Sequence, residues 1–361
     1  MMATVTVARL RRPLPWLGAC GCSLVCLAVG SAVADGTPRR VDLIRDLPAA
    51  GDLSAPANGQ TLYTLDEATG SVVAIDPFEP TKRWTAVAAA PQGTTATAIG
   101  SIDTGTVAVV SHGPRGWSLR CHRVQPGVTA NADEPTQTVA IGGGAAADVP
   151  GPRTAPPAAR PAIAVSPSRD WLVVAGLPAP AAAVLRAPIA GARVGGISTR
   201  SCPQLPPGCL PTAVTVSAAD EFVLFSRDPE AGDATGAFVS FHHPPHPRRL
   251  LHLDTGLPRV HDAAFCRADG TLWVVGGAPG SAATPEGLWR IDAVLRNGRQ
   301  DVRAVCVAPL DAAVALACLS DRAIAVTHGR SSRLVSLIDP AGDMPAKGEP
   351  RPADVPAGAK R

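Results

Sequence analysis

The feature that most constrains the fold of this chain is the stretch over residues 260–292. It contains an apolar run, a polar turn that closes with Asp269-Gly270, a second run rich in β-branched and aromatic residues, a loop, and a third run that ends at Asp292. Apolar runs joined by a short turn that ends in Asp-Gly are typical of antiparallel strands. The stretch therefore predicts three such strands.

Weaker copies of this unit recur along most of the chain. Their second strands begin near Gln60, Gly105, Trp171, Phe222, Thr271 and Arg322, in steps of 45, 66, 51, 49 and 51 residues. Fourth apolar runs follow at residues 83–88, 137–141, 192–199, 248–253 and 301–307. Four short strands repeated at this period predict an all-β fold, and specifically a β-propeller. Six copies make it a six-bladed β-propeller, with seven blades as the alternative.

Three short segments resemble a known type of repeat. Residues 165–170 read Val-Ser-Pro-Ser-Arg-Asp, residues 266–270 read Cys-Arg-Ala-Asp-Gly, and residues 334–339 read Leu-Val-Ser-Leu-Ile-Asp. This pattern, over about residues 40–340, resembles the YVTN-type and related beta-propeller repeats. The chain lacks the Gly-His and Trp-Asp motifs of WD repeats. The resemblance implies a propeller fold and no particular activity.

The two ends of the repeat region predict how the ring closes. The last copy has no fourth strand, because a tail rich in Pro, Ala and Lys follows Asp339. An apolar run at residues 41–45 has no partner near it in the sequence. We expect this N-terminal strand to pair with residues 333–338 and to complete the last blade, which leaves no long open edge.

The N-terminus is typical of a secretory signal. Three arginines precede 22 residues without charge, and small residues end the segment at Ala34. We therefore predict a signal peptide over residues 1–34, a propeller over 35–340, and a disordered tail over 341–361, with the mature protein secreted or periplasmic and no membrane span after cleavage. Two alternatives stay open: the segment remains as a membrane anchor, or Cys20 is lipidated.

Charge and cysteine content fit an exported protein. Cleavage after Ala34 removes three of 33 basic residues and no acidic residue, so the mature chain is near neutral and does not predict nucleic-acid binding. Six cysteines stay in the mature chain and can oxidise outside the cytoplasm. Cys202 and Cys209 flank a short proline-rich loop, so they are the candidate pair for a disulfide bond, and the alternative is a pair of small buried thiols. The connectivity of the other four stays open.

Candidate binding residues lie in the loops that follow the second strands. His112-Gly-Pro-Arg and His328-Gly-Arg occupy matching positions in the second and sixth copies. Imidazoles near carboxylates can bind a metal or act as acid and base, although histidines before glycine also occur simply in turns. The candidate ligand-binding residues are Asp66, His112, Arg115, His328 and Arg330.

No motif in the sequence predicts a reaction. A second histidine cluster at His242, His243 and His246 contains prolines that fix the backbone, and we expect a solvated turn there. The Gly-x-Ser-x-Gly, P-loop and His-Glu-x-x-His motifs are absent. We therefore predict a monomeric binding module, without metal or cofactor, for an unknown protein, a small molecule or a carbohydrate. The alternative is an extracytoplasmic hydrolase or lactonase with its site at the channel mouth.

Overall fold

The protein is seen here in a computed structural model. It describes residues 38–45, 47, 49–56, 58–141, 161–177, 184–197, 210–217, 222–227, 238–242, 251–266, 270–296, 299–319, 323–330 and 333–340. Within these ranges every regular element is a β-strand, and no helix occurs. The all-β prediction is therefore confirmed for the described part of the chain.

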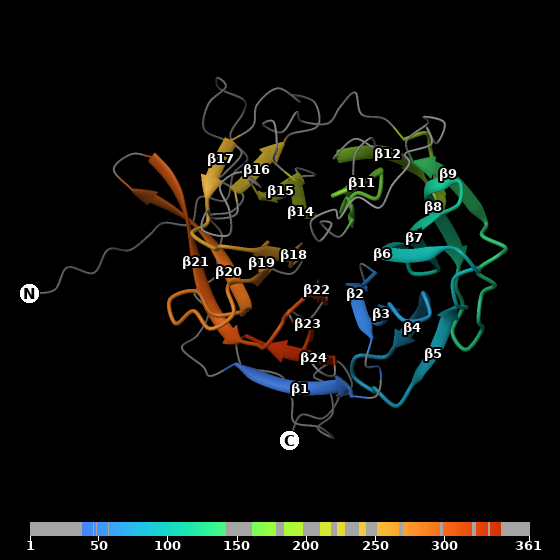
Figure 1. The fold of residues 1–361 in the computed structure, drawn as a ribbon, viewed down its shortest axis with the longest axis horizontal. Helices are drawn as coiled ribbons and strands as arrows, with labels where there is room; N and C mark the ends of the chain where they lie inside the picture. The colour runs from blue at the N-terminus through green and yellow to red at the C-terminus, as the bar shows by residue number, and fades with distance from the viewer. Residues whose placement is uncertain are drawn as a thin grey trace, which may run out of the picture.

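The described strands form four-stranded antiparallel sheets, which Figure 1 shows arranged around a centre. The first two sheets contain β2 (Ala50–Ser54), β3 (Leu62–Asp66), β4 (Ser71–Ile75) and β5 (Arg83–Val87), then β6 (Thr95–Asp103), β7 (Thr106–Gly113), β8 (Gly116–Arg123) and β9 (Gln137–Ile141). The next two contain β10 (Ala162–Val165), β11 (Trp171–Ala175), β12 (Val184–Ala190) and β13 (Arg193–Val194), then β14 (Leu210–Val216), β15 (Phe222–Arg227), β16 (Phe238–His242) and β17 (Leu251–Asp254). The fifth contains β18 (Val260–Phe265), β19 (Leu272–Gly276), β20 (Gly287–Arg296) and β21 (Arg299–Pro309). The sixth contains β22 (Ala315–Cys318), β23 (Ile324–His328), β24 (Leu334–Asp339) and β1 (Arg39–Ile44).

The stretch over residues 260–292 forms the three strands that its pattern predicts. Leu272 pairs with Phe265 on one side and with Ile291 on the other, so β19 lies between β18 and β20. Gly270 closes the first turn, where its N–H donates to the Cys266 carbonyl at 2.8 Å and its φ is 72°. That left-handed conformation favours glycine, which explains the Asp-Gly ending.

Neighbouring sheets pack face to face through apolar side chains. Leu62 and Ile75 of the first sheet, for example, share one buried cluster with Ala325 and Leu337 of the sixth. Full burial of each such aliphatic side chain contributes roughly 1.5–3 kcal/mol. The same contact brings the first and last sheets of the repeat region together, so the arrangement is a propeller-like ring.

The N-terminal strand takes the predicted place. β1 runs antiparallel to β24, with Val41 opposite Leu337 and Asp42 opposite Ser336, and it forms the outer edge of the last sheet (Figure 1). Ile44 is buried in the cluster between the first and sixth sheets. The expected pairing of residues 41–45 with residues 333–338 is confirmed.

Several predictions fall on residues that the structure does not describe. These are the signal segment over residues 1–34, the Cys202–Cys209 pair, the turn with His243 and His246, and the tail over residues 341–361. Among the described residues, no helix is long and apolar enough to span a membrane.

Candidate functional site: the central channel

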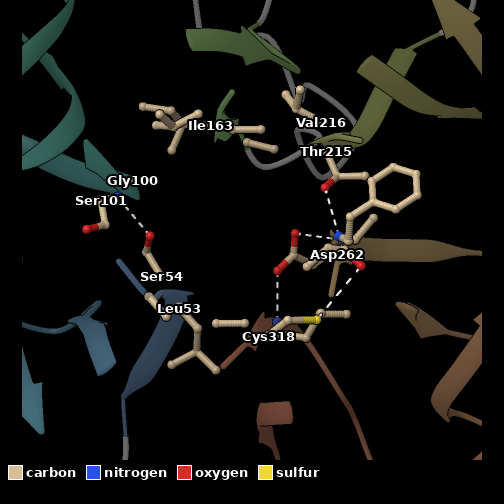
Figure 2. Close-up of a pocket in the computed structure, with 18 of the residues that line it drawn as sticks. Leu53, Ser54, Gly100, Ser101, Ile163, Thr215, Val216, Asp262 and Cys318 are labelled. Carbon is tan, nitrogen blue, oxygen red and sulfur yellow. Dashed lines mark hydrogen bonds between the residues drawn. The ribbon is translucent and has the colours of Figure 1, made fainter. Parts of the chain in front are cut away.

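A cavity of about 360 Å³ lies where the innermost strands of the sheets meet. Its wall comes from β2, β6, β10, β14, β18 and β22, and Figure 2 shows Leu53, Ile163 and Val216 among the side chains around it. Most lining residues are apolar, and many are small. The small ones are Ala55, Gly100, Ala162, Ala164, Ala263, Ala264 and Ala317. Small side chains on the innermost strands leave this space open.

Two carboxylates in the wall bridge neighbouring sheets. Asp52 of β2 accepts hydrogen bonds from its neighbour Leu53 N–H at 3.0 Å and from Ile99 N–H of β6 at 2.7 Å. Asp262 of β18 accepts from Ala263 N–H and from Leu316 N–H of β22, both at 2.8 Å. Both lie where the register of the innermost strand shifts. The shift lets the carboxylate reach the backbone of the next strand.

Two hydroxyl groups bridge sheets in the same way. Ser54 Oγ accepts from Ser101 N–H at 2.8 Å, and Thr215 Oγ1 accepts from Phe265 N–H at 3.2 Å. Figure 2 shows these bonds crossing between adjacent innermost strands. Backbone N–H groups at the sheet borders are thus satisfied by side chains of the wall, as buried donors require.

The described part of the wall carries two acidic residues. They are Asp52 and Asp262, and among the described residues that line the cavity none is a lysine, arginine or histidine. The Cys318 thiol donates a weak bond to the Ala264 carbonyl at 3.9 Å. The described lining, which combines apolar side chains with polar groups, suits a ligand that offers hydrogen-bond donors or positive charge beside an apolar part.

Asp66, the first predicted binding residue, caps a turn. Its carboxylate accepts from Ala68 N–H at 3.1 Å and from the Thr69 hydroxyl at 2.7 Å. These bonds satisfy backbone and side-chain donors of the loop between β3 and β4, as an Asx turn does.

His112 and Arg115 lie at the β7–β8 turn and are exposed. The His112 ring packs against the Trp117 ring, with 4.9 Å between the ring centroids and 53° between the planes. Among the described residues, the ring contact of His112 is thus with its own hairpin and not with His328.

His328 of β23 is buried, at 3% exposure, and belongs to a polar network that extends across β24 to the closing strand β1. Its Nε2 lies 2.8 Å from Ser336 Oγ, and that hydroxyl donates to Asp42 Oδ1 at 2.6 Å. Burial, and next the charge of Arg40, lowers the pKa of His328 to about 4, against the opposing effect of Asp42. Burial alone would raise the pKa of Asp42, but the Ser336 hydrogen bond and Arg40 together lower it.

Arg330 ties two loops together. Its guanidinium donates to Asp311 at 2.7 Å and to Glu286 at 3.1 Å, which joins the loop after β23 to the fifth sheet. On the other side, Arg333 donates to Glu67 at 2.7 Å and to the Ala50 carbonyl at 2.9 Å. The loop between β23 and β24 is therefore held to both neighbouring sheets.

None of the five predicted residues lines the central cavity. That they bind a ligand stays a prediction. Sequence reasoning missed Asp52 and Asp262, although a signal existed: each is an isolated acidic residue near the start of an apolar innermost strand. Within the described residues, no group of three or more His, Cys, Asp and Glu side chains is arranged to hold a metal. The described cysteines, which form no disulfide bond with one another, are Cys121, Cys266, Cys306 and Cys318.

Comparisons with known proteins inform the fold alone. No protein-family model and no curated protein matches the chain. The major allergen Mala s 1 of Malassezia sympodialis is similar in structure, with 12% identity, a TM-score of 0.50, and coverage of 84% of this chain and 97% of that chain. Hydrazine synthase of Kuenenia stuttgartiensis also matches, with 15% identity, a TM-score of 0.49, and coverage of 78% and 77%. The likeness to Mala s 1 supports a β-propeller fold without assigning the repeats to the YVTN type.

Proposed function

We propose that this protein is an exported six-bladed β-propeller that binds a small ligand in its central channel. The six four-stranded sheets and the pairing of β1 with β24 support the blade count. The arginines and the uncharged run of residues 1–34 support export.

The observation that carries the binding proposal is the cavity itself. Its volume of about 360 Å³ lies in the range of small-molecule sites, and its wall combines apolar side chains with polar groups that could orient a ligand. The carboxylates of Asp52 and Asp262 and the hydroxyls of Ser54 and Thr215 accept bonds from backbone N–H groups. Groups held in this way support binding better than proton transfer, which needs a group free to change its partner.

The charge of the wall defines the ligand class. We propose a small molecule that carries an amine or another hydrogen-bond donor beside an apolar part. A carboxylate or phosphate would face Asp52 and Asp262, and like charges repel.

The test is a screen of purified mature protein against a library of small amines, neutral molecules and carboxylates. Thermal shift identifies binders, and calorimetry measures their Kd. Ala164, a half-buried residue of β10 that lines the cavity and also packs against the cluster around Val173 and Val214, is changed to tryptophan to reduce the cavity. The exposed Ala89 outside the cavity is changed to tryptophan as a control for the added side chain, and urea unfolding checks that both variants keep their fold. Amines should bind wild type and Ala89→Trp alike and lose at least tenfold affinity in Ala164→Trp.

Other outcomes decide against the proposal. Binders that keep their affinity in Ala164→Trp would place the site outside the channel, and tighter binding of carboxylates would overturn the ligand class. The neutral molecules of the library include esters and lactones. Hydrolysis of any of these by the protein would favour the alternative of an extracytoplasmic hydrolase or lactonase.

Export has its own test. N-terminal sequencing of protein from the culture medium or periplasm should begin at Asp35. A start at Met1 or a lipidated Cys20 would contradict cleavage after Ala34 while leaving the channel proposal untouched. Peptide mapping of the same sample without reduction should recover Cys202 joined to Cys209.

A further inference from the structure

A second, much smaller cavity lies between the first and second sheets. Its lining comes from β5 and the segment after it, from β6, β7 and β8, and from Ala132. The segment after β8 crosses to β5 here, because Ala130 N–H donates to the Ala86 carbonyl and Ala88 N–H donates to the Ala130 carbonyl, both at 2.9 Å. The cavity thus lies where two sheets and a crossing loop meet.

Two polar side chains of β8 line this cavity, and each has one unsatisfied nitrogen. His122 is 2% exposed, and its Nδ1 has no hydrogen-bond partner in the described part of the chain. Arg120 Nε is also buried without a partner there, and its Nη1 makes only a long bond of 3.5 Å to the Ala132 carbonyl. An unsatisfied buried polar group costs roughly 1–3 kcal/mol. Two such groups beside one cavity point to a bound molecule.

The protonation of His122 determines what that molecule is. The ring makes a hydrogen bond to the Asn131 backbone, and since Nδ1 has no partner, this bond uses Nε2. A carbonyl accepts, so Nε2 carries the proton. Burial, and next the charge of Arg120, lowers the pKa of His122 to about 4, so the ring is neutral at pH 7. Nδ1 therefore offers a lone pair, whereas Arg120 Nε offers a hydrogen.

One lone pair and one N–H select a molecule that both donates and accepts. A water molecule can accept from Arg120 Nε–H and donate to His122 Nδ1. A chloride ion could accept from Arg120 but would meet the lone pair of Nδ1. The cavity volume of about 10 Å³ is close to the minimum for one water on the same measure, roughly 10–15 Å³. The buried Ser111 is a further polar residue in the lining.

We propose that this cavity binds a single structural water that links Arg120 to His122 at the junction of the first two sheets. Such a water would join the neutral imidazole to the guanidinium without a direct bond between them. It would also couple β8 to the crossing loop, since both residues contact the backbone of Asn131 or Ala132.

A crystal structure of the mature protein from bromide-containing solution tests the occupant. We expect one water within hydrogen-bond distance of Arg120 Nε and His122 Nδ1, and no anomalous bromide peak at that place. A bromide peak would overturn the proposal in favour of an anion, and a cavity without density would overturn it outright.

A double-mutant cycle in solution provides a second measurement. The variants are Arg120→Met, His122→Phe and the double variant, unfolded by urea at pH 7, where His122 is neutral. A shared water predicts that the double variant loses clearly less stability than the sum of the single losses. Additive losses would contradict a water that joins the two side chains.

Discussion

Ser336 is the position where one atom should matter most for closure of the ring. The side chain is fully buried, at 0% exposure, between His328 on β23 and Asp42 on β1. Its hydroxyl donates its only hydrogen to Asp42, so it accepts from His328 Nε2–H, and it also accepts from Arg40 Nε at 3.3 Å. Ser336→Ala removes these three contacts and keeps the backbone of β24.

The expected loss follows from what the variant leaves behind. A hydrogen bond to an ionised group is worth roughly 1.5–3 kcal/mol, and a buried donor left without a partner costs roughly 1–3 kcal/mol. Because both effects arise from one hydroxyl, we expect the free energy of unfolding to fall by about 2–4 kcal/mol. At about 2.1 cal/mol/K per residue for the roughly 230 residues that the structure describes, this lowers Tm by about 4–8 °C.

Urea unfolding followed by tryptophan fluorescence, together with calorimetry, measures this change. Ser118→Ala is the control, since Ser118 is a half-buried serine on β8, which belongs to the second sheet and not to the sheet that closes the ring. A change below about 0.5 kcal/mol is expected there, as for most peripheral positions. Equal Tm values for wild type and Ser336→Ala would refute the role of this network in closing the ring.

Three further predictions concern stability and titration. Deleting residues 35–45 from the mature protein should lower Tm clearly, because β1 and the buried Ile44 are lost, whereas deleting residues 349–361 should leave Tm unchanged in the same calorimetric scan. Burial lowers the pKa of His122 and of His328 to about 4, so the unfolded chain binds these two protons at a higher pH than the folded chain does. Urea unfolding should therefore show the free energy of unfolding falling between pH 6.5 and pH 4, by up to about 3 kcal/mol for each histidine. Tyr63 is the only tyrosine, and burial, then the charge of Asp103, raises its pKa to about 12, so absorbance at alkaline pH should titrate near 12 in folded protein and near 10 when unfolded.

The fold was predictable because short strands leave a strong local pattern. Alternation, Asp-Gly turns and the common Ile-Asp ending locate strands such as β19, β20 and β24 without knowledge of long-range contacts. Closure was predictable by counting, since residues 41–45 lacked a partner at one end and the last repeat lacked a strand at the other. Both inferences need only the order of the strands.

The chemistry of individual side chains was less predictable, and the two His-Gly turns show why. His112 and His328 end equivalent strands, yet one is exposed and the other is buried. His328 pairs with Leu334 on the next strand, and Ser336, two residues further along, forms a hydrogen bond with the His328 ring. His112 pairs with Trp117 in the same way, but the residue two places further along is the buried Leu119. At that position His112 therefore meets no hydroxyl, and its ring packs on Trp117. A local motif cannot encode this difference, because it depends on registers of neighbouring strands.

Two residues in the wall of the channel serve both the proposed binding and the stability of the fold, which limits the substitutions that can change ligand preference. Asp52 and Asp262 supply the charge that a ligand would meet, and they also accept the N–H groups of Ile99 and Leu316 across two sheet borders. Replacing either carboxylate would leave a backbone donor unsatisfied, at a cost of roughly 1–3 kcal/mol. Apolar lining residues such as Ala164 carry no such bond. Changes of ligand preference should therefore arise from the size of the apolar residues, while the two carboxylates stay fixed.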